Sequence, residues 1–103
     1  MTEVTEKVES MTYSRKFTLL NLFGLHVRPA TKIAEIALQY PNTEVTIKDE
    51  KNIEADAKVP LTILTIARPR GAQYLVTGVG PKAKEVVDRI VDASISRFYV
   101  DGD

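Results

Sequence analysis

The sequence of 103 residues predicts an α+β domain in which helices pack on one face of an open sheet. Three observations lead to this fold class. Segments of alternating apolar residues mark strands, segments with apolar residues three and four positions apart mark helices, and the two kinds interleave along the chain. Two strands follow each other near the middle, which predicts a hairpin and, with the flanking helices, a two-layer sandwich.

The first strand is expected over Arg15 to Asn21, with Phe17 and Leu19 on one face. A helix follows, because Pro29 suits a first helical turn and Pro41 ends the periodic segment after it. Its buried stripe is expected to consist of Ile33, Ile36, Ala37 and Tyr40.

The middle of the chain predicts a β-hairpin with one solvent-exposed face. Residues 44–48 and 53–57 alternate between apolar and polar, and the polar segment 49–52 lies between them. Pro60 can start a short helix through Ile66, although the β-branched residues of this segment could equally support a strand.

A further strand is expected over Gln73 to Thr77, and Gly80-Pro81 opens the last helix. The apolar face of that helix is expected to be Val86, Val87, Ile90, Val91 and Ile95. We therefore divide the chain into a flexible tail at 1–14, one domain at 15–97 and a frayed end at 98–103. A short acidic helix in the tail is the weaker alternative.

Composition excludes several classes of protein. The chain has 14 basic and 14 acidic residues, one histidine and no cysteine, which excludes disulfides and thiolate metal sites. Its zero net charge argues against a nucleic-acid binder, and no uncharged stretch, 59–67 included, is long enough for membrane insertion. The N-terminus is too polar for a secretory signal, so we expect a cytoplasmic protein, monomeric and without cofactors.

The informative stretch is Gly24-Leu25-His26-Val27-Arg28-Pro29-Ala30, where a strand ends and a helix begins. The first turn of a helix offers unpaired amides and a partial positive charge to an anion. Arg28 adds a fork of donors that matches phosphate oxygens. The same positive end favours neutral imidazole at His26, which is the nucleophilic form. These features fit a phosphohistidine, although a histidine near a helix start is more often a surface or capping residue.

The seven-residue stretch resembles the active-site signature of the histidine-containing phosphocarrier (HPr) family of the bacterial phosphotransferase system, over about Lys16 to Ser96. The resemblance implies an open-faced β-sandwich of four antiparallel strands covered on one face by three helices. It also implies that enzyme I, charged by phosphoenolpyruvate, phosphorylates His26 at Nδ1 and that Arg28 stabilises the phosphate. The carrier then passes the group to a histidine of an enzyme IIA domain in sugar transport, which makes it a transferase-type carrier more than an enzyme in the narrow sense.

The resemblance further implies an apolar surface that docks both partners. Its residues here are Val27, Thr31, Pro60, Leu61 and Leu64, of which Val27 and Leu61 are expected to be exposed. Three basic residues could add a rim that steers acidic partners, or could be solvated loop charges: Lys58, Arg68 and Arg70.

The sequence departs from the family pattern at three positions. Val59 stands where many members have a kinase-regulated serine, Phe23 replaces a polar residue before the signature, and Ala67 replaces a glycine. A regulatory binding module is therefore the alternative function. Its partner would be a kinase, a transcription regulator or a nitrogen-type phosphotransferase protein. A small nucleic-acid-binding domain ranks third.

Overall fold

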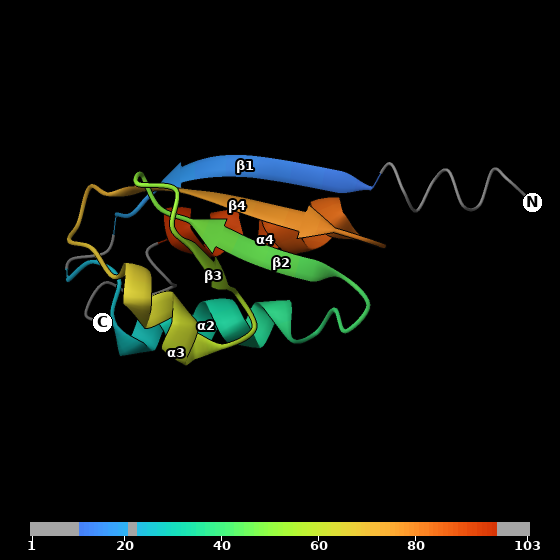
Figure 1. Cartoon of the computed structure of the whole chain (residues 1–103), viewed down its shortest axis with the longest axis horizontal. Helices are drawn as coiled ribbons and strands as arrows, with labels where there is room; N and C mark the ends of the chain where they lie inside the picture. Colours follow the sequence, from blue (N-terminus) through green and yellow to red (C-terminus); the bar gives the residue numbers. More distant parts are fainter. Residues whose placement is uncertain (1–10, 21–22, 97–103) are drawn as a thin grey trace, which may run out of the picture.

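A computed structural model describes residues 11–20 and 23–96, which form one four-stranded antiparallel sheet and three helices (Figure 1). The strands lie side by side in the order β1-β4-β2-β3. In chain order the elements are β1 (Thr12–Thr18), α2 (Val27–Ala37), β2 (Glu44–Lys48), β3 (Glu54–Asp56), α3 (Pro60–Ile63) with its 3₁₀ continuation η1 (Leu64–Ile66), β4 (Gln73–Val79) and α4 (Ala83–Ile95).

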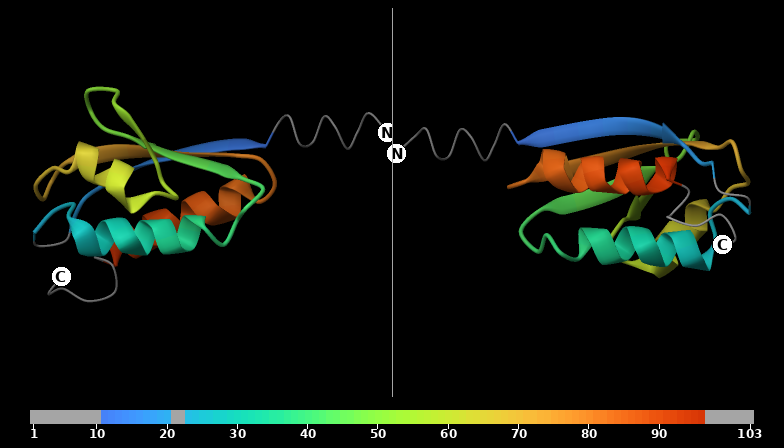
Figure 2. Two further views of the ribbon diagram at one scale, coloured as in Figure 1. Left: turned by 60° about the horizontal axis from the view of Figure 1, so that its bottom comes forward. Right: turned by 180° about the vertical axis from the view of Figure 1, so that it is seen from behind.

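The helices cover one face of the sheet and leave the other face open, which confirms the predicted fold class (Figure 2). Alternation along the strands produces the two faces, because successive side chains point to opposite sides. In β2, for example, Val45 and Ile47 are buried while Glu44 is exposed. The core joins these side chains to the inward stripes of α2 and α4.

The stripe predicted for α2 is buried, but the helix ends earlier than expected. Leu38 closes the helix after Ala37, three residues before Pro41. Tyr40 is nevertheless buried, and its hydroxyl donates to a Glu85 carboxylate oxygen at 2.6 Å. The apolar spacing therefore marks the residues that face the core more reliably than it marks the last helical residue.

The segment after Pro60 is helical, so the helix prediction is confirmed and the strand alternative is wrong. Pro60 occupies the first turn of α3, where its missing N–H costs no hydrogen bond. The threonines fit this helix because their hydroxyls donate to nearby carbonyls. The Thr62 hydroxyl donates to the Asp56 and Val59 oxygens at 2.8 Å, and that of Thr65 donates to the Thr62 oxygen at 2.6 Å.

Several strand boundaries and one core residue differ from the predictions: β1 ends at Thr18 and not at Asn21, and β3 covers 54–56 and not 53–57. Strand β1 begins at Thr12, so residues 12–14 belong to the sheet and not to a tail. They pair with residues 77–79 of β4, and that strand therefore continues past its predicted end at Thr77 to Val79. Ile95, predicted to be buried, is 55% exposed at the last position of α4. Residues 1–10 of the predicted tail, Asn21, Arg97 and the predicted frayed end at 98–103 lie outside the described residues.

Among the described residues, no helix has the length and apolar character that crossing a bilayer requires.

Candidate functional site

His26 forms the N-terminal cap of α2, and one ring nitrogen faces the start of the helix. Its backbone is extended, and its Nδ1 accepts a hydrogen bond from the Arg28 amide at 3.5 Å. No acidic side chain lies in the first turn, so no carboxylate of that turn competes for its donors. The positive end of the helix is therefore directed at Nδ1.

The amides of the first turn determine what an anion at Nδ1 would meet. Ala30 already donates to the His26 carbonyl at 3.0 Å, and Pro29 has no N–H to offer. The amides of Val27 and Arg28 are thus the donors nearest the cap, and the Arg28 amide already points at the imidazole. An oxygen-rich group bonded to Nδ1 would lie at the Arg28 amide, beside the start of the helix.

A tight turn holds His26 in this position. Gly24 adopts φ +72° and packs so closely that an added Cβ would lie 2.5 Å from the Arg68 carbonyl oxygen. The next residue, Leu25, is buried and donates its amide to the same oxygen at 2.9 Å. The loop that precedes β4 is therefore the anchor of the segment that carries His26.

Phe23 contacts His26 from the other side of this turn. Their ring centroids lie 6.3 Å apart with an interplanar angle of 73°, an edge-on arrangement. The Phe23 side chain is 65% exposed. From the sequence alone, Phe23 indicates only the loss of a polar neighbour. The signal for a contact was present, since Phe23 lies three residues before His26 across a turn glycine.

Two of the three residues of the predicted basic rim have partners within the chain. The Arg68 guanidinium lies 3.1 Å from a carboxylate oxygen of Asp49, and the Lys58 ammonium donates to the Tyr40 carbonyl at 2.8 Å. Arg70 is exposed on the surface.

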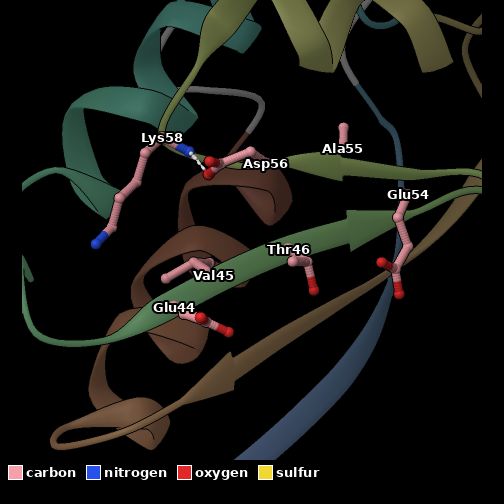
Figure 3. Close-up of a pocket in the computed structure, with 7 residues that line it drawn as sticks. All are labelled: Glu44, Val45, Thr46, Glu54, Ala55, Asp56 and Lys58. Atoms are coloured by element: carbon pink, nitrogen blue, oxygen red, sulfur yellow. Dashed lines mark hydrogen bonds between the residues drawn. The ribbon is translucent and has the colours of Figure 1, made fainter.

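Lys58 also lines a hollow along β2 and β3, beside the acidic residues Glu44, Glu54 and Asp56 (Figure 3). This hollow contains none of the acceptor-site residues. Among residues 11–20 and 23–96, no three histidine or carboxylate side chains converge in a way that could hold a metal ion.

Asp49 is a buried carboxylate whose ionised form the fold stabilises. Its side chain is 1% exposed and accepts from the Ile53 and Lys51 amides, both at 2.9 Å. The hydrogen bond from Ile53, with those from Arg68 and Lys51, lowers the pKa of Asp49 in spite of its desolvation. Arg68 therefore links this carboxylate to the loop that anchors the site.

The lowered pKa predicts a loss of stability in acid. A carboxyl group whose pKa is depressed by folding stabilises the protein above its unfolded value, about 3.9, and loses this effect as the pH falls through the folded-state pKa. Asp49→Asn should therefore lower the urea midpoint clearly at pH 7 and much less at pH 2.5. The exposed Asp92→Asn should change neither midpoint. Equal effects of Asp49→Asn at both pH values would contradict the assignment.

The predicted docking residues lie on α2, on α3 and, for Leu64, on the 3₁₀ turn η1, and α2 and α3 pack beside each other (Figure 1). Val27 and Leu61 are 64% and 75% exposed, which confirms the prediction for these two. Thr31 and Pro60 are half-buried, and Leu64 is half-buried against the core. Val59 precedes α3 without a side-chain cap and offers no hydroxyl for modification.

The sequence matches the family described as the PTS HPr component phosphorylation site over residues 13–94. It is 29% identical over 91 residues to the phosphocarrier protein NPr of Escherichia coli K12, covering 88% of this chain and all of that protein. It is 30% identical over 84 residues to NPr of Shewanella violacea, covering 82% and 90% of the two chains. The phosphocarrier protein HPr of Pseudomonas putida is 26% identical over 90 residues, covering 87% and 98%.

Solved structures show the same fold. HPr of Thermoanaerobacter tengcongensis superposes with a TM-score of 0.79 at 22% identity, covering 85% of this chain and 97% of that one. HPr of Bacillus anthracis superposes with a TM-score of 0.75 at 19% identity, covering 82% and 99%.

Proposed function

The chain belongs to the HPr family of phosphotransferase-system phosphocarriers, and from this premise we propose that His26 is the residue that carries the phosphoryl group. Phospho-enzyme I, charged by phosphoenolpyruvate, is the proposed donor, and a histidine of an enzyme IIA domain is the proposed acceptor. The observation that supports this role is the direction of Nδ1, which accepts from the Arg28 amide at the start of α2. The protein acts as a carrier that is itself the substrate of two transfers.

In the first transfer, the Nδ1 lone pair of His26 attacks the phosphorus on the donor histidine, and the donor P–N bond breaks. The proton on Nε2 remains on the ring, and the donor nitrogen recovers its electron pair. The Arg28 amide loses the imidazole acceptor and gains a phosphoryl oxygen, so the helix start stabilises the product. The second transfer reverses these steps toward enzyme IIA.

Incubation with enzyme I and phosphoenolpyruvate tests this function. We expect one phosphoryl group per chain, with the lability in acid and stability in base that a phosphoramidate bond has. Omission of enzyme I should leave the protein unlabelled. A label that survives acid would indicate a phosphate ester and contradict the proposed chemistry.

Arg28→Ala should slow phosphoryl transfer in at least one direction while the fold stays intact. Loss of one charge-assisted hydrogen bond costs about 1.5–3 kcal/mol, which corresponds to a roughly 10- to 150-fold lower rate constant. Arg28→Lys retains the charge without the planar fork, and its rate constant should lie between those of the natural protein and Arg28→Ala. Rapid-quench kinetics with both partners measures the effect. Unchanged rate constants in both directions would exclude Arg28 from the transfer step.

Docking of both partners is proposed at the apolar residues beside the acceptor. Val27 lies next to His26, and Leu61 is the most exposed large apolar side chain on α3. Small apolar contacts of this kind suit complexes that form and release rapidly. The partly buried Thr31, Pro60 and Leu64 would support this surface from below.

A second candidate is a regulatory carrier of the nitrogen-type branch, whose phosphorylation state signals and does not drive sugar uptake. Two observations favour it: relatives at 29% and 30% identity carry the name NPr, and Val59 leaves no hydroxyl at the position of the usual regulatory serine. Phosphorylated protein offered to a sugar-type and a nitrogen-type enzyme IIA discriminates the branches. Faster transfer to the nitrogen-type domain would support the second candidate.

A further inference from the structure

We propose that Phe23 is a positioning residue that covers Nε2 of His26 and so directs phosphorylation to Nδ1. This inference rests on the proposed function, because it concerns the nitrogen at which His26 reacts. It assigns a role to a side chain that the sequence comparison with the family pattern marks only as a departure.

The two ring nitrogens of His26 have different surroundings. Nδ1 accepts from the Arg28 amide at the helix start. Nε2 is buried from solvent and has no hydrogen-bond partner within residues 11–20 and 23–96. A donor molecule reaching His26 from solvent therefore finds Nε2 closed, although the histidine as a whole is only partly buried.

The hydrogen bond at Nδ1 also fixes the tautomer of the neutral ring. A nitrogen that accepts from an amide carries a lone pair, so the proton of neutral imidazole must be on Nε2. That N–H lacks a polar acceptor among the described residues, and the edge-on Phe23 ring lies beside the imidazole. The apolar Phe23 ring offers no hydrogen-bond donor and no charge to a phosphoryl group on Nε2.

The position of Phe23 is fixed on one side by the turn that follows it. Gly24 is packed against the backbone of the 68–70 loop, and Leu25 is tied to Arg68. The turn therefore fixes the backbone that follows Phe23, and the Phe23 ring lies beside His26 in spite of its exposure. Burial of apolar surface at this position stabilises the fold little, because the Phe23 side chain remains mostly in water.

Potassium phosphoramidate tests the inference without enzyme I. The His26 nitrogen attacks phosphorus, the P–N bond of the reagent breaks and ammonia leaves, so the site of reaction depends on this chain alone. NMR spectra of protein labelled with ¹⁵N-histidine distinguish the two phosphohistidine isomers. We expect Nδ1 phosphorylation in the natural protein and an increase of about tenfold or more in the Nε2 product for Phe23→Ala, equal to at least ~1.4 kcal/mol of lost discrimination.

Three further variants define what Phe23 contributes. Phe23→Tyr keeps the ring and should restore Nδ1 selectivity, while Phe23→Leu tests whether apolar bulk is sufficient. Leu38→Ala removes another exposed apolar side chain, at the far end of α2, and should leave the isomer ratio unchanged. Amide spectra of each variant should match those of the natural protein, because Phe23 and Leu38 are both mostly exposed.

An unchanged isomer ratio in Phe23→Ala would overturn the inference, as would Nε2 phosphorylation of the natural protein. These outcomes differ from failure of the proposed function. A protein that takes no phosphoryl group from enzyme I, yet changes its isomer ratio with phosphoramidate when Phe23 is removed, would lack the carrier role and retain the positioning role.

Discussion

His26→Ala should take up no acid-labile phosphoryl group from enzyme I and phosphoenolpyruvate, even after prolonged incubation. The chain contains one histidine, so no second imidazole can replace it. Hydroxyl groups near the site, such as that of Thr31, would form esters that survive acid and are therefore separable by the same assay. We expect a complete loss of labelling, in contrast to the partial loss expected for Arg28→Ala.

A matched variant separates this chemical loss from structural damage. His26 caps α2 through Nδ1, so alanine removes a cap as well as a nucleophile, at a cost of about 1 kcal/mol. His26→Asn supplies one of the best capping side chains and no imidazole. It should show the stability of the natural protein by thermal unfolding and remain unlabelled. Acid-labile label on either variant would show that His26 is not the acceptor.

The sequence predicts the fold well where the spacing of apolar residues within one element determines which of them face the core. Ile33, Ile36 and Ala37 repeat at helical spacing, and all three are buried. The first strand was placed less well. Its early part has the polar sequence Thr-Tyr-Ser, and it is ordered by pairing with β4 more than 60 residues away. Pairing of that kind is a tertiary interaction, which local alternation does not encode.

The same distinction applies to the site. His26 and Arg28 lie two residues apart, and a helix start brings them together, so the sequence was sufficient to predict their proximity. The pairing of Arg68 with Asp49 is not predictable from the sequence, because Asp49 lies 19 positions earlier and is brought to Arg68 only by the fold. The Arg68 carbonyl oxygen also accepts from the Leu25 amide, and a backbone contact of this kind cannot be predicted from the residue type.

Gly24→Ala should destabilise the protein by about 2–5 kcal/mol. A non-glycine residue in the left-handed region costs about 1–2 kcal/mol, and forcing a Cβ into closely packed backbone costs about 1–3 kcal/mol more. The expected clash is with backbone atoms of Arg68, Pro69 and Arg70, at 2.5–2.9 Å from the added Cβ. Backbone cannot rotate aside as a flexible side chain can. Urea unfolding monitored by circular dichroism measures the change in the free energy of unfolding.

Gly71→Ala is the matched control, because Gly71 also has a positive φ, +96°, but no atom within 4 Å of its added Cβ. It should lose only the conformational part, about 1–2 kcal/mol. The difference between the two variants therefore measures the close approach at Gly24 alone, since any effect on the unfolded chain is common to both. Only Gly24→Ala should also slow phosphorylation under conditions where both variants are folded, because it displaces Leu25 from the Arg68 carbonyl and His26 with it. Equal losses of stability and rate in the two variants would mean that the contact with the 68–70 loop does not position the acceptor.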